Sequence, residues 1–175
     1  MPALTVDILK KDPDVRTYIG EANECLKVLG YTEHGSRHAS LVSHIAQNVL
    51  DRLELPRRTA ELAAIAGYLH DIANIVGRPG HPQSGALMAW DILRSYNVPA
   101  HEVALVASAI GNHEEKTGQA VNEVAAALIL ADKTDVHRSR VQNPDELKFD
   151  VHDRVNYAVH RSFLRVTPKE STISL

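Results

Sequence analysis

Six histidine and aspartate side chains beside apolar helical patterns are the residues best suited to chemistry. Two of them, His70 and Asp71, are adjacent in the stretch GYLHDIANI (residues 67–75), directly after an apolar run. Adjacent ionisable groups beside a core are costly to desolvate unless they pair, accept hydrogen bonds or hold a metal ion. The other members of the set decide among these alternatives.

Three further side chains, His38, His113 and Asp132, lie on the apolar stripes of three predicted helices. Each has aliphatic residues three, four and seven positions away, which places it on the same helical face as those residues. His81 begins another helix after a loop rich in glycine and proline. A single inward-facing histidine is most often a hydrogen-bonded core residue. Four histidines and two aspartates from separate helices need a common neutralising partner, however, and this predicts one or two divalent ions of Mn, Fe, Zn, Ni or Co.

The other six histidines are expected not to be metal ligands. They are His34, His44, His101, His137, His152 and His160. His34 lies in a loop that is expected to border the site, and the others lie at helix edges or in polar segments. Competing catalytic motifs are absent, because the sequence has no HExxH, GxSxG, Walker-type glycine loop or paired CxxC.

Helical periodicity runs through most of the chain and predicts an all-α bundle. The predicted helices span about residues 14–29, 36–52, 57–73, 83–96, 100–113, 122–137 and 152–162. We predict a single domain, residues 1–175, with a helical core at about 34–140 and a C-terminal helix and β-hairpin at about 150–175.

The C-terminal stretch FLRVTPKESTISL (residues 163–175) differs from the rest of the chain. Its two β-branched runs flank Pro-Lys-Glu, which predicts the short β-hairpin. Because the sequence ends within an apolar strand, we expect either a partner strand from a second subunit, and so a homo-oligomer, or a truncated chain.

Composition limits the class of protein. Hydrophobic residues make up 44% and charged residues 23% of the chain, as is usual for a globular protein. The net charge of −3 and the aromatic content of 5% argue against a surface for extended nucleic acid. The apolar runs are too short to cross a bilayer, and one cysteine rules out an intrachain disulfide framework. We therefore expect a cytoplasmic protein that binds neither membranes nor extended nucleic acid.

The six side chains form, in chain order, a pattern that resembles the HD-domain metal-dependent phosphohydrolases. They are His38, His70, Asp71, His81, His113 and Asp132. The resemblance covers about residues 34–140, with the context RHASLVSHIA, AGYLHDIAN, HPQSGA, IGNHE and LILADKTD. It implies one ion held by His38, His70, Asp71 and Asp132. Asp71 would bridge to a second ion held by His81 and His113, as in the binuclear members of the family.

Two subgroups of this family are similar to parts of the chain. The stretches HDI and NHEEKTG resemble the HD-GYP cyclic-di-GMP phosphodiesterases. Asn74 and Asn112 replace an expected lysine and histidine of that group, and its Gly-Tyr-Pro signature is missing. LHDIA and the spacing from Asp132 to Arg138 resemble the bacterial diadenosine tetraphosphate hydrolases, but Glu114 stands where that group has threonine.

The resemblance implies a phosphohydrolase that cleaves an ester or anhydride of a nucleotide-like small molecule with a metal-activated water. Asp71 and His70 would be its catalytic residues. Basic side chains near the ligands in sequence would hold phosphate oxygens. These are Arg78, Lys116, Lys133 and Arg138. Arg37 precedes a ligand but faces another side of its helix, so it is a weaker candidate.

Two other functions stay open at this point. A few proteins of the same fold use a mixed-valent di-iron pair for oxygen-dependent cleavage of small substrates, and nearly the same ligands would serve that reaction. A nucleotide-sensing or scaffolding module without turnover is also compatible with a retained metal site. Metal identity and substrate are not determined by the pattern.

Overall fold

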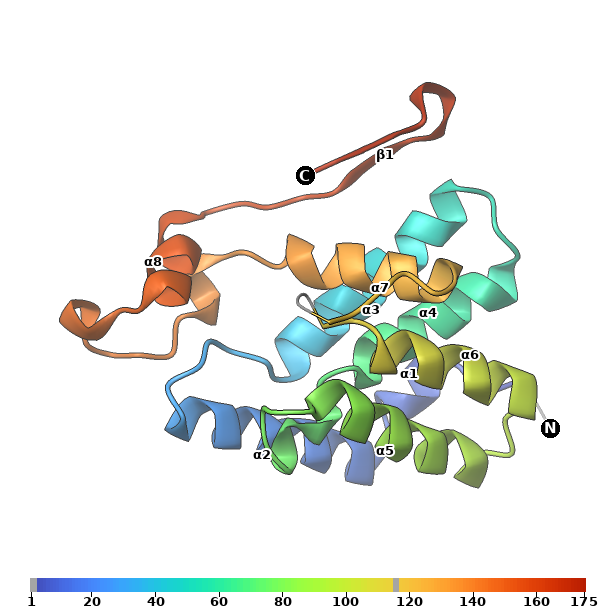
Figure 1. Cartoon of the computed structure of the whole chain (residues 1–175), viewed down its shortest axis with the longest axis horizontal. Coiled ribbons are helices and arrows are strands. Elements are labelled where there is room, and N and C mark those ends of the chain that lie inside the picture. The colour runs from blue at the N-terminus through green and yellow to red at the C-terminus, as the bar shows by residue number, and fades with distance from the viewer. Residues whose placement is uncertain (1–2, 115–116) are drawn as a thin grey trace.

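The computed structural model describes residues 3–114 and 117–175, and it is built mainly of helices (Figure 1). The α-helices are α1 (Val6–Leu9), α2 (Pro13–Val28), α3 (Ser36–Arg52), α4 (Arg57–Leu69), α5 (His81–Ser95), α6 (Ala100–Gly111), α7 (Glu123–Thr134) and α8 (Val151–Ala158). Short 3-10 helices lie at Ile72–Ile75, Arg138–Arg140, Glu146–Lys148 and Pro168–Glu170. Strands β1 (Arg165–Thr167) and β2 (Thr172–Ser174) form an antiparallel hairpin. The predicted all-α class and the C-terminal hairpin are confirmed.

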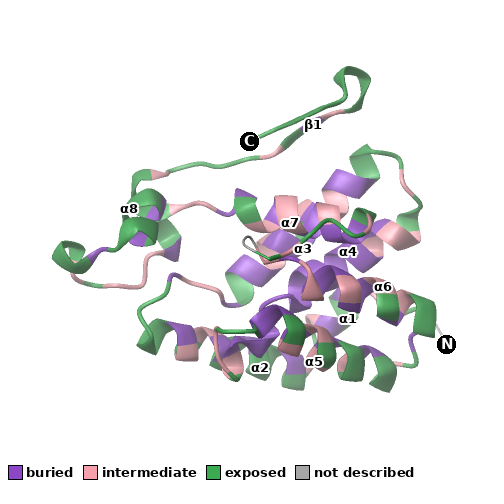
Figure 2. Cartoon of the chain, viewed as in Figure 1, coloured by how far each residue is buried: buried purple, intermediate pink, exposed green. Residues whose placement is uncertain are grey.

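Helix α4 occupies the centre of the core. Every residue from Leu62 to Leu69 is buried (Figure 2), and the helix contacts α3, α6 and α7. Its sequence LAAIAGYL is apolar on all sides, as expected for a helix enclosed by other helices. Because α4 ends inside the protein, it delivers His70 and Asp71 to the interior rather than to the surface.

Helices α3 and α4 approach each other closely at Gly67. A Cβ atom at this position would lie 2.8 Å from both the backbone N and the Cα of Ser43. Only glycine permits this separation, and it occurs one turn before His70. Since His38 lies in the first turn of α3, the close approach helps to bring these two histidines together.

Helix ends account for the differences from the sequence prediction. The helix expected at 57–73 ends at Leu69 and is followed by the separate 3-10 helix; those expected at 122–137 and 152–162 end at Thr134 and Ala158. The last two end early because His137 and Val159 are extended, and the N–H of Arg138 donates to the Val159 carbonyl over 2.9 Å. Hydrogen bonds between distant segments outweigh local periodicity there. The short helix α1 was not predicted.

The C-terminal segment extends away from the helical core (Figure 1). Helix α8 packs against the 3-10 helix Arg138–Arg140, and all of β2 is exposed. Pairing of the terminal strand with a second subunit stays a prediction. None of the described helices combines the length and apolar character needed to cross a membrane.

Candidate metal centre

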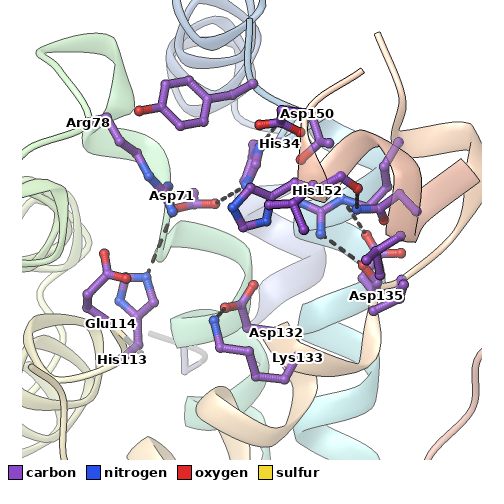
Figure 3. A pocket seen from close by; sticks show the side chains of 17 residues that line it. His34, Asp71, Arg78, His113, Glu114, Asp132, Lys133, Asp135, Asp150 and His152 are labelled. Carbon is purple, nitrogen blue, oxygen red and sulfur yellow. Dashed lines mark hydrogen bonds and ion pairs between the residues drawn. The ribbon is translucent and has the colours of Figure 1, made fainter. Parts of the chain in front are cut away.

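The six predicted ligands meet at the ends of five helices. His38 lies in the first turn of α3, and His70 and Asp71 directly follow α4. His81 is the first residue of α5, His113 lies just beyond α6, and Asp132 lies in the last turn of α7. Figure 3 shows Asp71, His113 and Asp132 around one pocket. Five separate segments therefore contribute to one cluster.

Asp71 lies in the middle of this cluster. Its Oδ2 atom is 3.2 Å from Nε2 of His70 and 3.7 Å from Nε2 of His38. Its Oδ1 atom is 3.3 Å from Nε2 of His81 and 4.0 Å from Nε2 of His113. Atoms that share an ion at about 2.0–2.2 Å lie about 3–4 Å apart, so these separations suit metal ligation. Each carboxylate oxygen faces a different pair of histidines, which suits a bridging ligand.

Asp132 completes one side of the cluster. Its Oδ1 atom is 3.3 Å from Nε2 of His38 and 3.6 Å from Nε2 of His70. Ligand atoms of His38, His70 and Asp132 all lie within 4.8 Å of one another, and so do those of His70, Asp71 and His113. The structure therefore holds two overlapping groups of three ligands that share His70.

Each of the four histidines uses its Nδ1 atom outside the cluster. The acceptors are the carbonyls of Gly67 (2.9 Å, from His70), Ile110 (2.6 Å, from His113) and Arg78 (2.9 Å, from His81), and the carboxylate of Asp135 (2.7 Å, from His38). The carbonyls of Gly67 and Ile110 lie in the last turns of their helices, where the regular helical hydrogen bonding ends, and the backbone N–H of His113 also donates to Ile110 over 3.4 Å. Donation from Nδ1 leaves the lone pair of Nε2 directed at the carboxylates, which is the tautomer that a metal ligand requires.

His81 provides the most direct sign that the cluster is built for a cation. Its Nε2 atom is buried and makes no hydrogen bond among the described residues, although Oδ1 of Asp71 lies 3.3 Å away. A buried polar atom without a partner costs about 1–3 kcal/mol. A metal ion would satisfy this atom, so the residues present fit the group.

The carboxylates dominate the electrostatics of the cluster. Burial opposes a charge on His70, but Asp71 and Asp132 raise its pKa to about 10. Burial also opposes a charge on Asp71, yet His70 holds the pKa of that carboxyl well below its usual range. Burial and the charge on His70 lower the pKa of His113 to about 4. The cluster thus combines ionised carboxylates with a protonated His70 and a neutral His113, and a cation would compete with the proton on His70.

Asp135 is a candidate functional residue that sequence reasoning missed. Its side chain is 1% exposed, and it accepts hydrogen bonds from His38 and from both terminal nitrogens of Arg37, at 3.2 and 2.8 Å. Burial opposes its charge, but these donors keep its pKa below the usual range. One indication of this residue was present in the sequence, because Asp135 lies three residues after the predicted ligand Asp132. Asp135 lies just beyond the end of α7, so helical periodicity did not place it.

Two other side chains support Asp71. Asn74 donates from Nδ2 to Oδ1 of Asp71 over 2.9 Å and so fixes the carboxylate. His34, which was expected to border the site, lies with Nε2 4.0 Å from Oδ2 of Asp71. Burial lowers the pKa of His34 to about 3, so its ring is neutral beside the cluster.

The predicted phosphate-binding residues fall into three groups. Arg78 and Lys133 line the pocket, with Nη1 of Arg78 3.4 Å from Asp71 and Nζ of Lys133 3.1 Å from Asp132. Arg138 does not line the pocket; its guanidinium lies 4.7 Å from the ring centroid of Tyr157. Lys116 lies outside the described residues. The structure thus brings two of the four to the cluster.

The pocket that opens from the cluster has a volume of about 530 Å³. The metal-ligand cluster forms one part of its lining, and α8 with the loop around Tyr31 forms another. In Figure 3, Glu114 and His113 lie at one end and His152 lies toward the other. This is the size of cavity that takes a small organic ligand.

Known proteins are similar to the chain over the helices that carry this cluster. A family model described as HD domain matches residues 35–146, a range that contains all six predicted ligands and ends before α8. An uncharacterised protein of Methanocaldococcus jannaschii is 29% identical to the chain, over 87% of this chain and 67% of that protein. No solved structure matches the chain.

Proposed function

Because the chain belongs to the HD-domain family, we propose that it is a metal-dependent phosphohydrolase acting on a phosphate ester or anhydride of a nucleotide-like small molecule. The observation that carries this proposal is the convergence of four histidine Nε2 atoms on the two oxygens of Asp71, at 3.2–4.0 Å. The cluster borders a pocket of about 530 Å³, which is large enough for a substrate of that kind.

The ligand set would hold two divalent ions. His38, His70 and Asp132 would hold one ion together with Asp71, and His81 and His113 would hold a second through the other oxygen of Asp71. When bound, such ions lower the pKa of a water molecule and polarise a phosphoryl oxygen. The two oxygen atoms of the Asp71 carboxylate support this assignment, because each oxygen lies near its own pair of histidines.

Arg78 and Lys133 would bind phosphate oxygens of the substrate. Each now pairs with a carboxylate of the cluster, Asp71 or Asp132. When those carboxylates ligate a cation, their charge is shared with it and the pairing with Arg78 and Lys133 weakens. Charge-assisted hydrogen bonds from Arg78 and Lys133 to a phosphoryl group would then replace the ion pairs.

The test is a phosphate-release screen on reconstituted protein. Protein stripped with a chelator is reloaded separately with Mn, Fe, Co, Ni or Zn and offered nucleoside mono-, di- and cyclic phosphates. We expect metal-dependent phosphate release in wild-type protein and none in Asp71→Asn. His44→Ala is the matched control, because His44 is exposed and its Nε2 bonds the side chain of Asn48.

Two results would contradict the proposal. Absence of phosphate release with every metal and substrate would leave a sensing or scaffolding role. A reaction that requires iron and consumes oxygen would indicate the di-iron alternative instead.

A further inference from the structure

Helix α8 forms a wall of the pocket in which two valines lie beside His152 and Asn156, and phosphate hydrolysis does not use these valines. Val151 and Val155 lie four residues apart on one face of α8, and both line the pocket. They are 67% and 51% exposed. We infer that this wall, with Tyr31, forms a subsite for a flat, uncharged ring of the substrate, such as a nucleobase. The inference rests on the proposed function and names the part of the substrate that does not react.

The orientation of α8 is set by its polar side, not by its valines. Asp153 and Asn156 are the buried residues of the helix. Asn156 accepts from the N–H of His137 over 3.1 Å and donates to the carbonyl of His152 over 2.9 Å. A surface helix normally buries its apolar face against the core. Here the hydrogen bond from the N–H of His137 to Asn156 holds the polar face inward, and the valines are left on the pocket surface.

The charges of the lining favour a neutral group at α8. The arginine and lysine side chains among the described lining residues are Arg78, Lys133 and Arg140. The first two lie beside the metal-ligand carboxylates. Arg140 is 8% exposed and donates to the carbonyls of Asp135 and Glu33, at 2.8 and 3.0 Å. None of the three is on α8.

Asp150, at the start of α8, adds a carboxylate to this part of the lining. It caps the helix by accepting from the N–H of Asp153 over 2.8 Å, and Figure 3 shows it on the pocket wall. A second phosphate of a substrate would meet this negative charge, and α8 contributes no arginine or lysine to the described pocket lining. An uncharged ring meets no such penalty.

Tyr31 supplies an aromatic surface in the same pocket. Its side chain is 42% exposed, and the guanidinium of Arg78 lies 5.9 Å from its ring centroid. The ring thus lies beside the predicted phosphate-binding group, where it can contact a base carried by the same molecule. Val151 and Val155 lie beyond residues 35–146, so the family match does not cover this wall.

Binding of a fluorescent nucleotide tests the subsite without requiring turnover. 2-Aminopurine riboside 5′-phosphate is titrated with metal-loaded protein, and the change in base fluorescence gives Kd. Ribose 5-phosphate is measured as a competitor, because it keeps the phosphate and lacks the base. We expect Val155→Asn to weaken nucleotide binding by about threefold to tenfold, as lost burial of part of a valine implies, and to leave ribose 5-phosphate unchanged.

The control variant is Val28→Asn, a change of the same type at an 86% exposed position of α2 that lines none of the described pockets. It should bind both ligands as wild type does. Wild-type affinity of Val155→Asn for the nucleotide, or an equal loss for both ligands, would overturn the subsite. Absence of nucleotide binding to wild-type protein would overturn it as well. Binding without phosphate release leaves the subsite standing and contradicts the hydrolase alone.

Discussion

Substitution of Asp135 by asparagine should weaken metal binding although Asp135 is not itself a predicted ligand. In the native protein its Oδ2 atom accepts from Nδ1 of His38 over 2.7 Å, which keeps the Nε2 lone pair of His38 directed at the cluster. An asparagine that turns its amide nitrogen toward Nδ1 would stabilise the opposite tautomer. A proton on Nε2 would then point at Asp132, 3.3 Å away, where the ion should be.

The expected loss follows from the contacts that disappear. A hydrogen bond to a buried charged group contributes about 1.5–3 kcal/mol. Loss of such a partner behind a ligating histidine typically lowers metal affinity about 10- to 100-fold, or about 1.4–2.8 kcal/mol. Asp135 also pairs with the 39% exposed Arg37, which solvent screens, and with the buried Arg140 at 3.5 Å, but neither contact fixes the tautomer of His38. We therefore expect the effect to come mainly through His38.

Titration of metal-free protein with Co²⁺ in competition with a chelator measures the affinity, and the visible spectrum of bound cobalt reports the ligand geometry. Glu33→Gln is the matched control, since Glu33 pairs with Arg37 over 2.8 Å without contacting His38. It should bind cobalt like wild-type protein. If Asp135→Asn binds Co²⁺ with wild-type affinity and spectrum, the reasoning is refuted. If the loss of Co²⁺ affinity in Asp135→Asn is accompanied by an equal loss in the thermal stability of the metal-free protein, the role of Asp135 is structural instead.

Three further predictions follow from particular contacts. His113→Ala should lower the metal content of reconstituted protein from about two ions to about one by elemental analysis, because His113 faces only one oxygen of Asp71; an unchanged content would remove it from the ligand set. Gly67→Ala should lower the free energy of unfolding by about 1–3 kcal/mol, since its Cβ would lie 2.8 Å from the Ser43 backbone; a thermal midpoint equal to or above wild type would show that α3 and α4 separate freely. Glu102→Gln should cost about 1 kcal/mol or less at neutral pH, because Arg58 lowers the pKa of Glu102 below 4.5 in the folded state. That contribution is present above pH 4.5 and is lost as the pH falls through the folded pKa, so the thermal midpoints of the two proteins should converge in acid and a constant gap would contradict the ion pair.

The helices and the inward-facing ligands were readable from the sequence because periodicity is a local property of the chain. Aliphatic residues three, four and seven positions from His38, His113 and Asp132 mark one helical face, and that face is buried in the structure apart from partial exposure at its edges. The chemical types of the six ligands also narrowed the chemistry before their positions were known. For this reason the all-α class was predictable, and so was a cluster of the six side chains.

The tertiary structure decided which other side chains reach the cluster. Arg78 and Arg138 both lie near predicted ligands in sequence, yet Arg78 lines the pocket and Arg138 packs on Tyr157. The cause is the end of α7 at Thr134, after which the backbone follows long-range hydrogen bonds that no periodic pattern encodes. The end of α7 also brings the carboxylate of Asp135 into contact with Nδ1 of His38, on the side of the ring away from the cluster.

Helix α8 shows the same division. A helix was expected from about residue 152, and a surface helix usually turns its apolar side chains toward the core. The structure instead buries Asp153 and Asn156, because Asn156 bonds the N–H of His137 from a segment 19 residues away. Local spacing therefore determined that these residues form a helix and share a face. Contacts between distant segments determined what that face meets.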